Sequence, residues 1–240
     1  MPSAKALVRA EAHHEFLRLL AAAERRPWYA AGAGDRPNAT GRRHERLKRG
    51  FDVAVAVAAL PLVFPALAVC IVAIKLDSPG PAVFVQLRTG RGGRLFRMFK
   101  LRTMVLDAEK FKEEYRGRSS RAWPDFKIED DPRITRVGAF LRRTSLDELP
   151  QVFNVLRGDM SWVGPRPTSF SPRAYSLWHT ARLAAKPGVT GLWQVMGRNR
   201  LEFDERVRLD VAYLRHESLW LDLRILARTV GCVLSGRGAC

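Results

Sequence analysis

Two adjacent acids, Asp147 and Glu148, lie in the segment RRTSLDELPQ of a strongly basic chain. The local pattern offers them an ordinary role, because Ser145 and Glu148 have the spacing of a helix capping box. Acids in a first helical turn are also favoured by the helix dipole, and Pro150, which lacks an N–H group, is typical of a first turn. Taken alone, this segment favours a helix that begins at or near the acids.

The same position suits phosphate chemistry. A helix N-terminus presents free N–H groups and the positive end of the dipole, an environment that favours the ionised carboxylate a nucleophile needs. A second carboxylate one residue away can share a Mg²⁺ ion, whose charge offsets both the acids and an incoming diphosphate. The acids therefore fit either a helix cap or a catalytic pair, and the neighbouring motifs must decide between them.

Two downstream motifs favour the catalytic interpretation. The segment GDMSWVGPRP places Arg166 between Pro165 and Pro167, where the arginine has little conformational freedom to lose when it binds a phosphate. The segment KPGVTGLWQV contains Gly191 and Gln194 in a glycine-punctuated loop with an aromatic residue, which suits a base or a sugar. The sequence thus combines acids, a constrained arginine and a ligand-binding loop.

A long apolar run must hold these motifs near a membrane. Its 22 residues, Val53 to Ile74, contain no charge, and as a straight helix they would span about 33 Å, enough for a hydrocarbon core of roughly 30 Å. Pro61 and Pro65 fall in its middle, and a proline costs about 3 kcal/mol in a regular helix. Basic residues flank both ends, which the positive-inside rule places on the cytoplasmic side. We favour a re-entrant hairpin that bends at the prolines, with a single span as the alternative.

The remaining elements are a β-hairpin and several helices. Residues 82–104 predict two short strands around the turn TGRGG. Helices are expected at residues 105–118, 134–143 and 146–157, and two amphipathic helices between 201 and 234. In the last of these an apolar stripe fits either a protein core or a membrane interface. Its members are Leu219, Trp220, Leu223, Leu226, Val230 and Val233.

Composition limits the function classes. The 240 residues include 41 Lys+Arg and 24 Asp+Glu, a formal net charge of +17, so an anionic partner is expected. The three cysteines lack CxxC spacing, which argues against a disulfide framework or a zinc site. A nucleic-acid-binding protein would explain the charge but not the apolar run. A non-enzymatic membrane scaffold would explain the run but would leave the acid pair and Pro-Arg-Pro unexplained.

Four ordered motifs complete the pattern: LKRGFDVAVA before the apolar run, FKLRTM after it, RRTSLDELPQVFNVLRGDMSWVGPRP, and KPGVTGLWQVMGRN. With the proline-containing membrane segment, they are similar to the bacterial sugar transferase family, the monotopic phosphoglycosyl transferases that initiate glycoconjugate or exopolysaccharide synthesis. The resemblance covers about residues 47–234 and corresponds to the short form of the family.

The resemblance implies transfer of a sugar-1-phosphate from a UDP-sugar to a polyprenol phosphate, usually undecaprenyl phosphate. It also implies Mg²⁺, a covalent intermediate and release of UMP. The implied fold is α+β and mainly helical, with a proline-broken re-entrant membrane helix, a short β-hairpin and interfacial amphipathic helices around a catalytic domain. That domain would lie on the cytoplasmic face of the bacterial inner membrane, beside anionic lipids, with no nucleic-acid partner. The sugar is not indicated.

By motif, Asp147 resembles the nucleophile and Glu148 its partner in metal binding and proton handling, and the two would hold Mg²⁺. Arg166, with Pro165 and Pro167, would hold phosphate. The other implied phosphate- or nucleotide-binding positions are Gly191, Gln194, Lys100 and Arg102. The implied anchor and break of the membrane helix are Lys48, Arg49, Phe51, Asp52, Pro61 and Pro65.

We expect three regions. Residues 1–45 would form an N-terminal extension and linker, residues 46–76 the re-entrant helix-break-helix, and residues 77–240 the catalytic domain. One departure concerns the break, where some family members have a Ser-Pro pair and this chain has Phe64-Pro65. The hydroxyl that could bond a freed carbonyl is therefore missing, and another contact must stabilise the bend.

Overall fold

The structure is a computed structural model that describes residues 41–108, 110–111, 128, 131–168, 175–196 and 201–234. The expected N-terminal extension, and most of the helix expected at 105–118, lie outside these residues. The helices are α2 (Arg42–Asp77), α3 (Arg136–Thr144), α4 (Gln151–Arg157), α5 (Leu192–Met196), α6 (Phe203–Arg215) and α7 (Leu219–Leu234). Short 3-10 helices are η2 (Arg91–Gly93), η4 (Leu146–Glu148) and η6 (Leu177–Ala184). The strands are β1 (Val83–Thr89), β2 (Leu95–Leu101), β3 (Ser161–Val163) and β4 (Gly188–Thr190). The chain is thus mainly helical, as expected.

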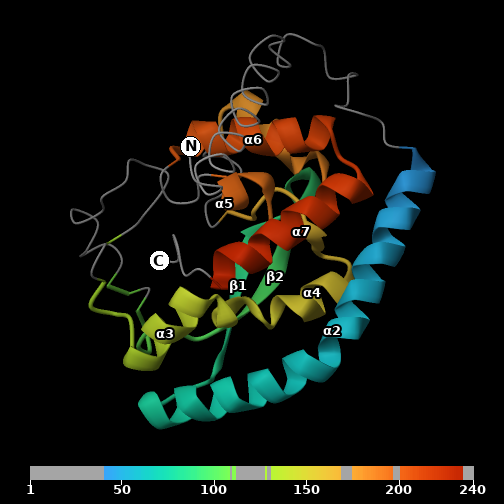
Figure 1. The fold of residues 1–240 in the computed structure, drawn as a ribbon. Coiled ribbons are helices and arrows are strands. Elements are labelled where there is room, and N and C mark those ends of the chain that lie inside the picture. Colours follow the sequence, from blue (N-terminus) through green and yellow to red (C-terminus); the bar gives the residue numbers. More distant parts are fainter. Residues whose placement is uncertain are drawn as a thin grey trace, which may run out of the picture.

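Helix α2 is continuous through both prolines, so the expected helix break is instead a bend, visible in Figure 1. Each proline removes the hydrogen bond to the carbonyl four residues earlier, and Pro61 and Pro65 are themselves four residues apart, on one face. Both are exposed, so the bend carries the helix around the body of the protein. Phe64, at the position where a serine hydroxyl was noted as missing, contacts Phe153 of α4 edge-on, with ring centroids 6.0 Å apart.

One stripe of α2 packs against the protein while most of its apolar surface does not. The buried positions recur at helical spacings of three, four or seven residues: Asp52, Ala56, Val63, Leu67, Cys70 and Ile74. Other large side chains on the same helix are exposed: Val57, Leu62, Phe64, Val69, Val72 and Leu76. Within the described part of the chain, only this helix is long and apolar enough to cross a membrane, and its most apolar window is 22% buried. A core helix would be mostly buried, so this surface fits a lipid environment better.

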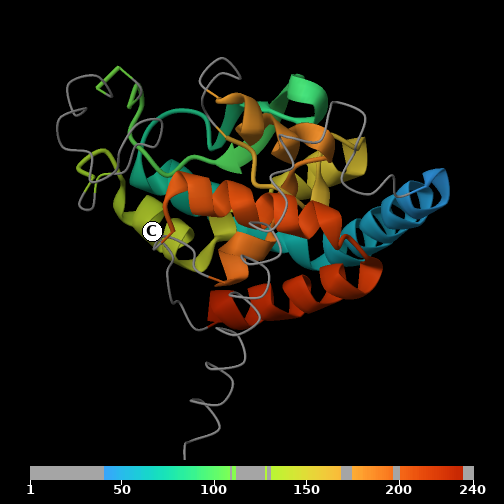
Figure 2. The same cartoon turned by 90° about the horizontal axis from the view of Figure 1, so that it is seen from above.

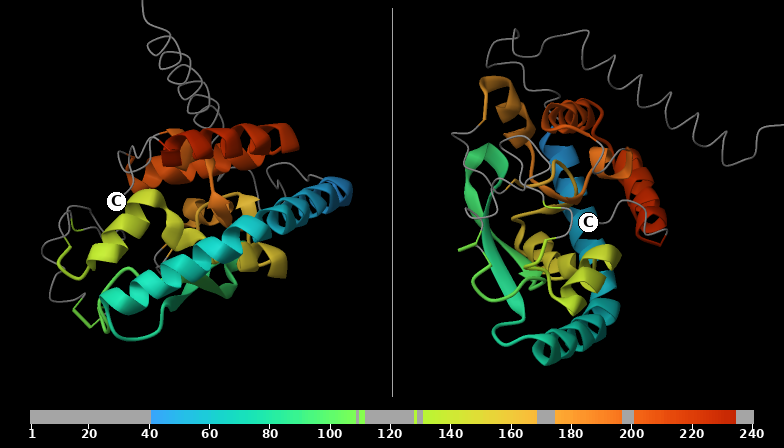
Figure 3. Two further views of the ribbon diagram at one scale, coloured as in Figure 1. Left: turned by 60° about the horizontal axis from the view of Figure 1, so that its bottom comes forward. Right: turned by 90° about the vertical axis from the view of Figure 1, so that its left-hand side faces the viewer.

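The expected hairpin is confirmed. β1 and β2 pair antiparallel in a register that runs from Val83 opposite Leu101 to Thr89 opposite Leu95. Asn154, fully buried on α4, donates to the Arg97 carbonyl (2.7 Å) and accepts from the Phe99 N–H (3.0 Å). This side chain therefore fixes α4 on β2, and Figure 3 shows the hairpin at the opposite edge of the molecule from α7.

The two expected C-terminal helices are present as α6 and α7, and α5 packs against both of them (Figure 2). Apolar side chains of α2, β2, α3 and α4 form one core cluster, and those of α5, α6 and α7 form another. The predicted stripe on α7 is divided: Trp220, Leu223 and Val230 are exposed, whereas Leu226 packs against the core cluster that contains Ile225. Arg224 lies 5.5 Å from the ring centroid of Trp220, so a cation borders the exposed apolar side chains.

Candidate active site

Two acids and two cations from three separate segments meet beside α4. The Lys100 ammonium at the end of β2 lies 3.0 Å from Glu148 Oε1 and 3.7 Å from Asp147 Oδ2. The Arg166 guanidinium makes two contacts with Glu148, one to Oε1 and one of 3.3 Å to Oε2. The structure thus brings together four of the predicted site residues: Asp147, Glu148, Lys100 and Arg166.

The acids lie in a 3-10 turn between two helices, and the expected capping box is wrong. Ser145 has the left-handed backbone conformation (φ 59°) that ends α3, and its side chain makes no cap hydrogen bond to η4. Glu148 instead faces the cations, which outcompete a local N–H group for its carboxylate. Helix α4 begins only at Gln151, with Pro150 as its N-cap.

Arg166 is held by a close approach of two loops. The Gly164 N–H donates to the Thr190 carbonyl, and the Gly188 N–H donates to the Pro165 carbonyl, both at 3.0 Å. A Cβ atom on Gly188 would lie only 2.2 Å from the Gly164 nitrogen, so glycine is required here. Pro165 and Pro167 are buried on either side of the half-buried Arg166, as a constrained arginine requires.

The segment of Gly191 and Gln194 was expected to be a loop, but Gln194 lies in helix α5, and Gly191 directly precedes that helix. Gly191 packs against the same backbone as Gly188. A Cβ atom on Gly191 would lie 2.5 Å from the Gly164 carbonyl oxygen and 3.5 Å from Gln194 Oε1. The motif of these two residues is therefore adjacent to Pro165-Arg166.

Arg102 is not brought to the acids. Its guanidinium donates to the carbonyls of Ser78 (2.8 Å) and Pro79, directly after α2. These bonds satisfy carbonyls at the end of the membrane helix, so Arg102 has a structural role here, and the expectation that it binds phosphate beside Lys100 has no support from its contacts.

The surroundings move the pKa values of the two acids in opposite directions. Burial raises the pKa of Asp147, and the nearby Glu148 charge adds to this, while Lys100 and Arg166 oppose it. Burial alone would also raise the pKa of Glu148. The charges of Arg166 and Lys100 outweigh burial, however, and hold this pKa well below its usual range. Glu148 is therefore firmly ionised. The expected low pKa of a helix N-terminal carboxylate does not apply to Asp147.

A second buried ion pair, not anticipated from the sequence, holds the backbone of Arg166. Arg182 on η6 donates to the Arg166 carbonyl (2.7 Å) and pairs with Asp210 on α6 (2.6 Å), and both side chains are almost fully buried. Asp210 lies between the apolar residues Leu209 and Val211, and an acid inside such a run was the only signal available in the sequence.

The Lys-Arg-x-Phe-Asp motif fastens α2 to the catalytic elements. Lys48 pairs with Asp222 of α7 (2.5 Å), and Arg49 donates to the last carbonyls of α4, those of Val155 (2.5 Å) and Leu156 (2.7 Å). Asp52 accepts from the Ser161 hydroxyl (3.0 Å) on β3. Each charged residue of the motif therefore contacts an element other than α2, as the predicted anchoring role requires.

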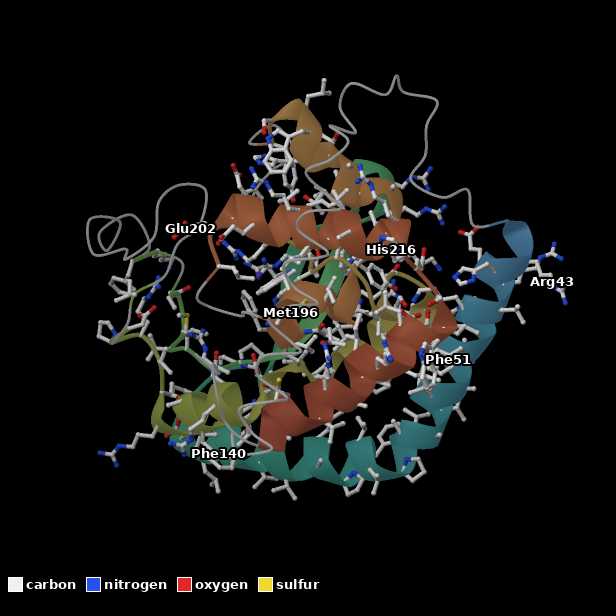
Figure 4. All side chains as sticks on the ribbon, turned by 45° about the horizontal axis from the view of Figure 1, so that its top comes forward. Arg43, Phe51, Phe140, Met196, Glu202 and His216 are labelled. Carbon is white, nitrogen blue, oxygen red and sulfur yellow. The ribbon has the colours of Figure 1, made fainter. Side chains whose placement is uncertain are left out.

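Phe51, the remaining predicted anchor residue, lies on the side of α2 toward α7 (Figure 4). Arg43, the second residue of the same helix, points away from the protein in that view. The helix therefore presents its motif to the protein and other basic side chains to the surroundings.

The acid pair fits Mg²⁺ only in combination with a substrate. Among the residues that the structure describes, no group of three or more acidic, His or Cys side chains could hold a metal by itself. Mg²⁺ commonly uses one or two carboxylates and completes its shell with substrate phosphates and water. Asp147 and Glu148 match that donor set, and when bound the ion would supply positive charge to a diphosphate.

The chain is similar in sequence to several sugar transferases. The galactosyl transferase CpsE of Streptococcus agalactiae is 46% identical over 198 residues, which cover 82% of this chain and 44% of that protein. The undecaprenyl-phosphate galactose phosphotransferase of Salmonella typhimurium is 44% identical over 198 residues, which cover 80% of this chain and 41% of that protein. The UDP-glucose:undecaprenyl-phosphate glucose-1-phosphate transferase of Caulobacter vibrioides is 44% identical over 199 residues, covering 78% and 70%. The chain spans less than half of the first two relatives.

The family model described as bacterial sugar transferase matches residues 43–236. This match begins at the start of α2 and includes the acid pair, the Pro-Arg-Pro segment and the loop of Gly191. The chain therefore belongs to the bacterial sugar transferase family.

Proposed function

We propose that this protein transfers a sugar-1-phosphate from a UDP-sugar to a polyprenol phosphate, with undecaprenyl phosphate as the acceptor, and releases UMP. One arrangement carries this proposal: a carboxylate, Asp147, lies beside an ionised Glu148 and two cations, next to a long exposed apolar helix. The names of the Salmonella and Caulobacter relatives, which include undecaprenyl phosphate as a substrate, support the same acceptor class.

In the first step an Asp147 carboxylate oxygen attacks the phosphorus that carries the sugar. A bond forms between this oxygen and phosphorus, the bond from phosphorus to the bridging oxygen breaks, and UMP leaves with that oxygen and its electron pair. The raised pKa of Asp147 increases its nucleophilicity in the ionised form. Lys100, 3.7 Å away, favours ionisation and thus opposes complete protonation.

The surrounding side chains orient the diphosphate. Arg166 is already bound to Glu148 through a forked contact, and its guanidinium has further N–H groups for phosphate oxygens. Lys100, at the end of β2, adds a second positive charge beside the two acids. Glu148 holds both cations in place, and with Asp147 it would hold Mg²⁺, which supplies charge stabilisation to the diphosphate.

In the second step a polyprenol phosphate oxygen attacks the same phosphorus. The bond to Asp147 breaks, the carboxylate is restored, and the product is a polyprenol diphosphate sugar. The acceptor head group stays at the bilayer surface, so the site must lie at that height. Exposed apolar side chains on α2 and α7 support a monotopic placement, with α2 re-entrant and α7 interfacial. We assign the protein to the cytoplasmic face of the bacterial inner membrane.

The test is intact-protein mass after the detergent-purified protein is mixed with Mg²⁺ and a panel of UDP-sugars, without lipid acceptor. Wild type, Asp147→Asn and a control, Asp107→Asn, are compared. Asp107 is an exposed aspartate with positive φ, a conformation that asparagine also tolerates. We expect a sugar-phosphate adduct in wild type and the control and none in Asp147→Asn.

The donor that forms the adduct would also identify the sugar, since the relatives named above differ between galactose and glucose. Turnover with polyprenol phosphate but no adduct would indicate direct transfer and another role for Asp147. If neither an adduct nor turnover is found with any donor, the proposed reaction is wrong.

A further inference from the structure

Arg182 on η6 holds the backbone of Arg166 from the interior of the protein. One guanidinium nitrogen, Nη2, lies 2.7 Å from the Arg166 carbonyl oxygen and 2.6 Å from Asp210 Oδ2 on α6. Because Nη2 carries two hydrogen atoms, it can make both contacts at once. The Arg182 and Asp210 side chains are only 4% and 1% exposed, so water does not compete for either contact.

The Pro165–Pro167 segment needs a side-chain partner because regular strand pairing ends before it. β3 pairs with β4 only as far as Val163, and a segment with two prolines lacks the N–H groups that would continue the ladder. The Gly188 N–H still reaches the first carbonyl of the segment. Among the residues that the structure describes, the next carbonyl, that of Arg166, accepts from the Arg182 side chain and not from a backbone N–H group.

The carbonyl that Arg182 holds belongs to the residue whose side chain faces the acid pair. The Arg166 guanidinium contacts both oxygens of Glu148, and its side chain is 29% exposed, so part of it remains open to a ligand. A group that orients a reacting phosphate must be placed accurately, since a shift of about 1 Å can cost roughly a hundredfold in rate. A fixed backbone at Arg166 therefore matters to the chemistry and not only to the fold.

Stability alone does not account for this buried pair. Arg182 also lies 5.8 Å from the ring centroid of Phe203, the first residue of α6, so the pair joins η6 to α6 in an apolar environment. Burying two charges is expensive, and apolar residues of similar size often serve a protein's stability equally well or better. A pair at this position is therefore explained better by the carbonyl that it holds.

We propose that Arg182, with Asp210 as its counter-charge, is a positioning residue for diphosphate binding by Arg166. This inference rests on the proposed function, because it takes the diphosphate of a UDP-sugar as the ligand of Arg166. Arg182 does not touch the donor itself, and its whole effect passes through the Arg166 carbonyl. Changes at the two arginines should therefore have non-additive effects on donor binding.

The experiment is a double-mutant cycle on UDP binding, measured by isothermal titration calorimetry of the detergent-purified full chain with Mg²⁺. UDP carries the diphosphate but no sugar, so binding is measured without transfer. Arg182→Met/Asp210→Leu replaces the pair without leaving an unpaired charge in the interior, and it is combined with Arg166→Ala. Thermal unfolding is measured first. If the pair variant does not unfold cooperatively, Arg182→Lys enters the cycle instead, because it keeps a charge beside Asp210 while its shorter side chain withdraws the donor from the Arg166 carbonyl.

We expect Arg166→Ala to weaken UDP binding roughly 10- to 100-fold, the usual range for hydrogen bonds to a charged group. Replacing the pair should weaken UDP binding about two- to tenfold, as the loss of one hydrogen bond does. Adding the pair replacement to Arg166→Ala should cause no further loss. Fully additive effects would overturn the proposal, and so would a pair variant that binds UDP as wild type does.

Arg133→Met/Asp131→Leu is the matched control. Arg133 also pairs with an aspartate (2.6 Å) and donates to a backbone carbonyl, that of Ala108 (3.1 Å), and the two side chains are 7% and 5% exposed. We expect its replacement to leave UDP binding unchanged. An equal loss of UDP binding in the control would mean that any buried pair affects binding, and Arg182 would then have only a structural role.

The outcomes also separate this inference from the proposed function. If the wild type binds UDP and forms the sugar-phosphate adduct but the cycle is additive, only the positioning role is wrong. If the wild type binds no UDP, both are wrong, because Arg166 then has no diphosphate to hold. If UDP binding is non-additive but no donor gives adduct or product, the positioning role stands and the transfer reaction is wrong.

Discussion

Asp147 and Glu148 are adjacent in the chain, yet their environments differ enough to divide the work between them. Glu148 receives Lys100 and a forked contact from Arg166, so it remains ionised and organises the cations. Asp147 is equally enclosed but lies farther from Lys100, and burial raises its pKa. Pairs of acids whose pKa values are moved apart commonly have distinct catalytic roles. At the residue scale this contrast favours Asp147 as the nucleophile.

Asp210 gives the first prediction, a pH dependence of stability. Burial raises its pKa to about 7, with Arg182 and Arg206 acting in the opposite direction. Between about pH 4 and about pH 7 the folded chain therefore holds a proton that the unfolded chain has lost, and stability falls as pH rises through this window. We expect Asp210→Asn, which stays neutral at every pH, to have a flatter dependence of stability on pH.

The measurement is the unfolding temperature of the detergent-solubilised protein at several values from about pH 5 to about pH 8. Asp107→Asn, which removes an exposed acid, should keep the wild-type slope. An Asp210→Asn slope as steep as that of wild type would mean that another group causes the dependence.

The sequence predicted the residues of this site unevenly. Asp147, Glu148 and Arg166 were identified because their motifs resemble those of a known family. The local capping pattern at Ser145 was misleading, since a motif of four residues contains no information about cations from β2 and the Pro-Arg-Pro loop. Arg182 and Asp210 were missed because their pairing joins η6 to α6 across 28 residues of sequence, without a motif at either position.

At the scale of elements, α2 depends on Lys48 for its attachment to α7. Lys48 pairs with Asp222, whose side chain is fully buried and also accepts from the Tyr213 hydroxyl (2.7 Å). Lys48→Met leaves that carboxylate buried without a cation, and we expect a loss of roughly 3–5 kcal/mol in the free energy of unfolding. Adding Asp222→Asn should recover most of the loss, because the neutral amide still accepts from Tyr213.

Chemical denaturation of the solubilised protein measures both variants. Lys110→Met, which changes a lysine that is 75% exposed, is the control and should have almost no effect. A double variant as unstable as Lys48→Met would show that Lys48 contributes through its packing and not through its charge.

The elements themselves followed from the sequence wherever a local pattern repeats. The hairpin, α6 and α7 were expected from alternation, glycines and amphipathic spacing. For α2 the sequence predicted a break, but the helix stays continuous, because packing of its buried stripe on α4 compensates for the hydrogen bonds that Pro61 and Pro65 remove. Such packing depends on a partner element that no local pattern reveals.

At the scale of the whole molecule, the bend in α2 predicts that both ends of the helix lie on the same side of a membrane. In a chain whose native cysteines are replaced by alanine, Gly41→Cys and Lys110→Cys mark the regions before and after α2. We expect a membrane-impermeant maleimide to label both from the same side of sealed vesicles. Labelling from opposite sides would establish a single span instead.

Pro61→Ala/Pro65→Ala provides the matched comparison. Without the prolines the 36 residues of α2 can form a straight helix of about 54 Å, long enough to cross a bilayer. We expect part of this variant to expose its two cysteines on opposite sides. If labelling is identical with and without the prolines, the basic flanks alone determine the side on which the two ends of α2 lie.

The bonds from Arg49 to the last carbonyls of α4 have a mechanical consequence. Helix α4 is only seven residues long, about 10 Å, and its first turn adjoins the acid pair. This short helix therefore connects α2 to the proposed nucleophile, Asp147. A thinner or thicker bilayer that tilts α2 should therefore move Asp147 relative to the lipid phosphates. We expect this displacement to change the rate of the acceptor step.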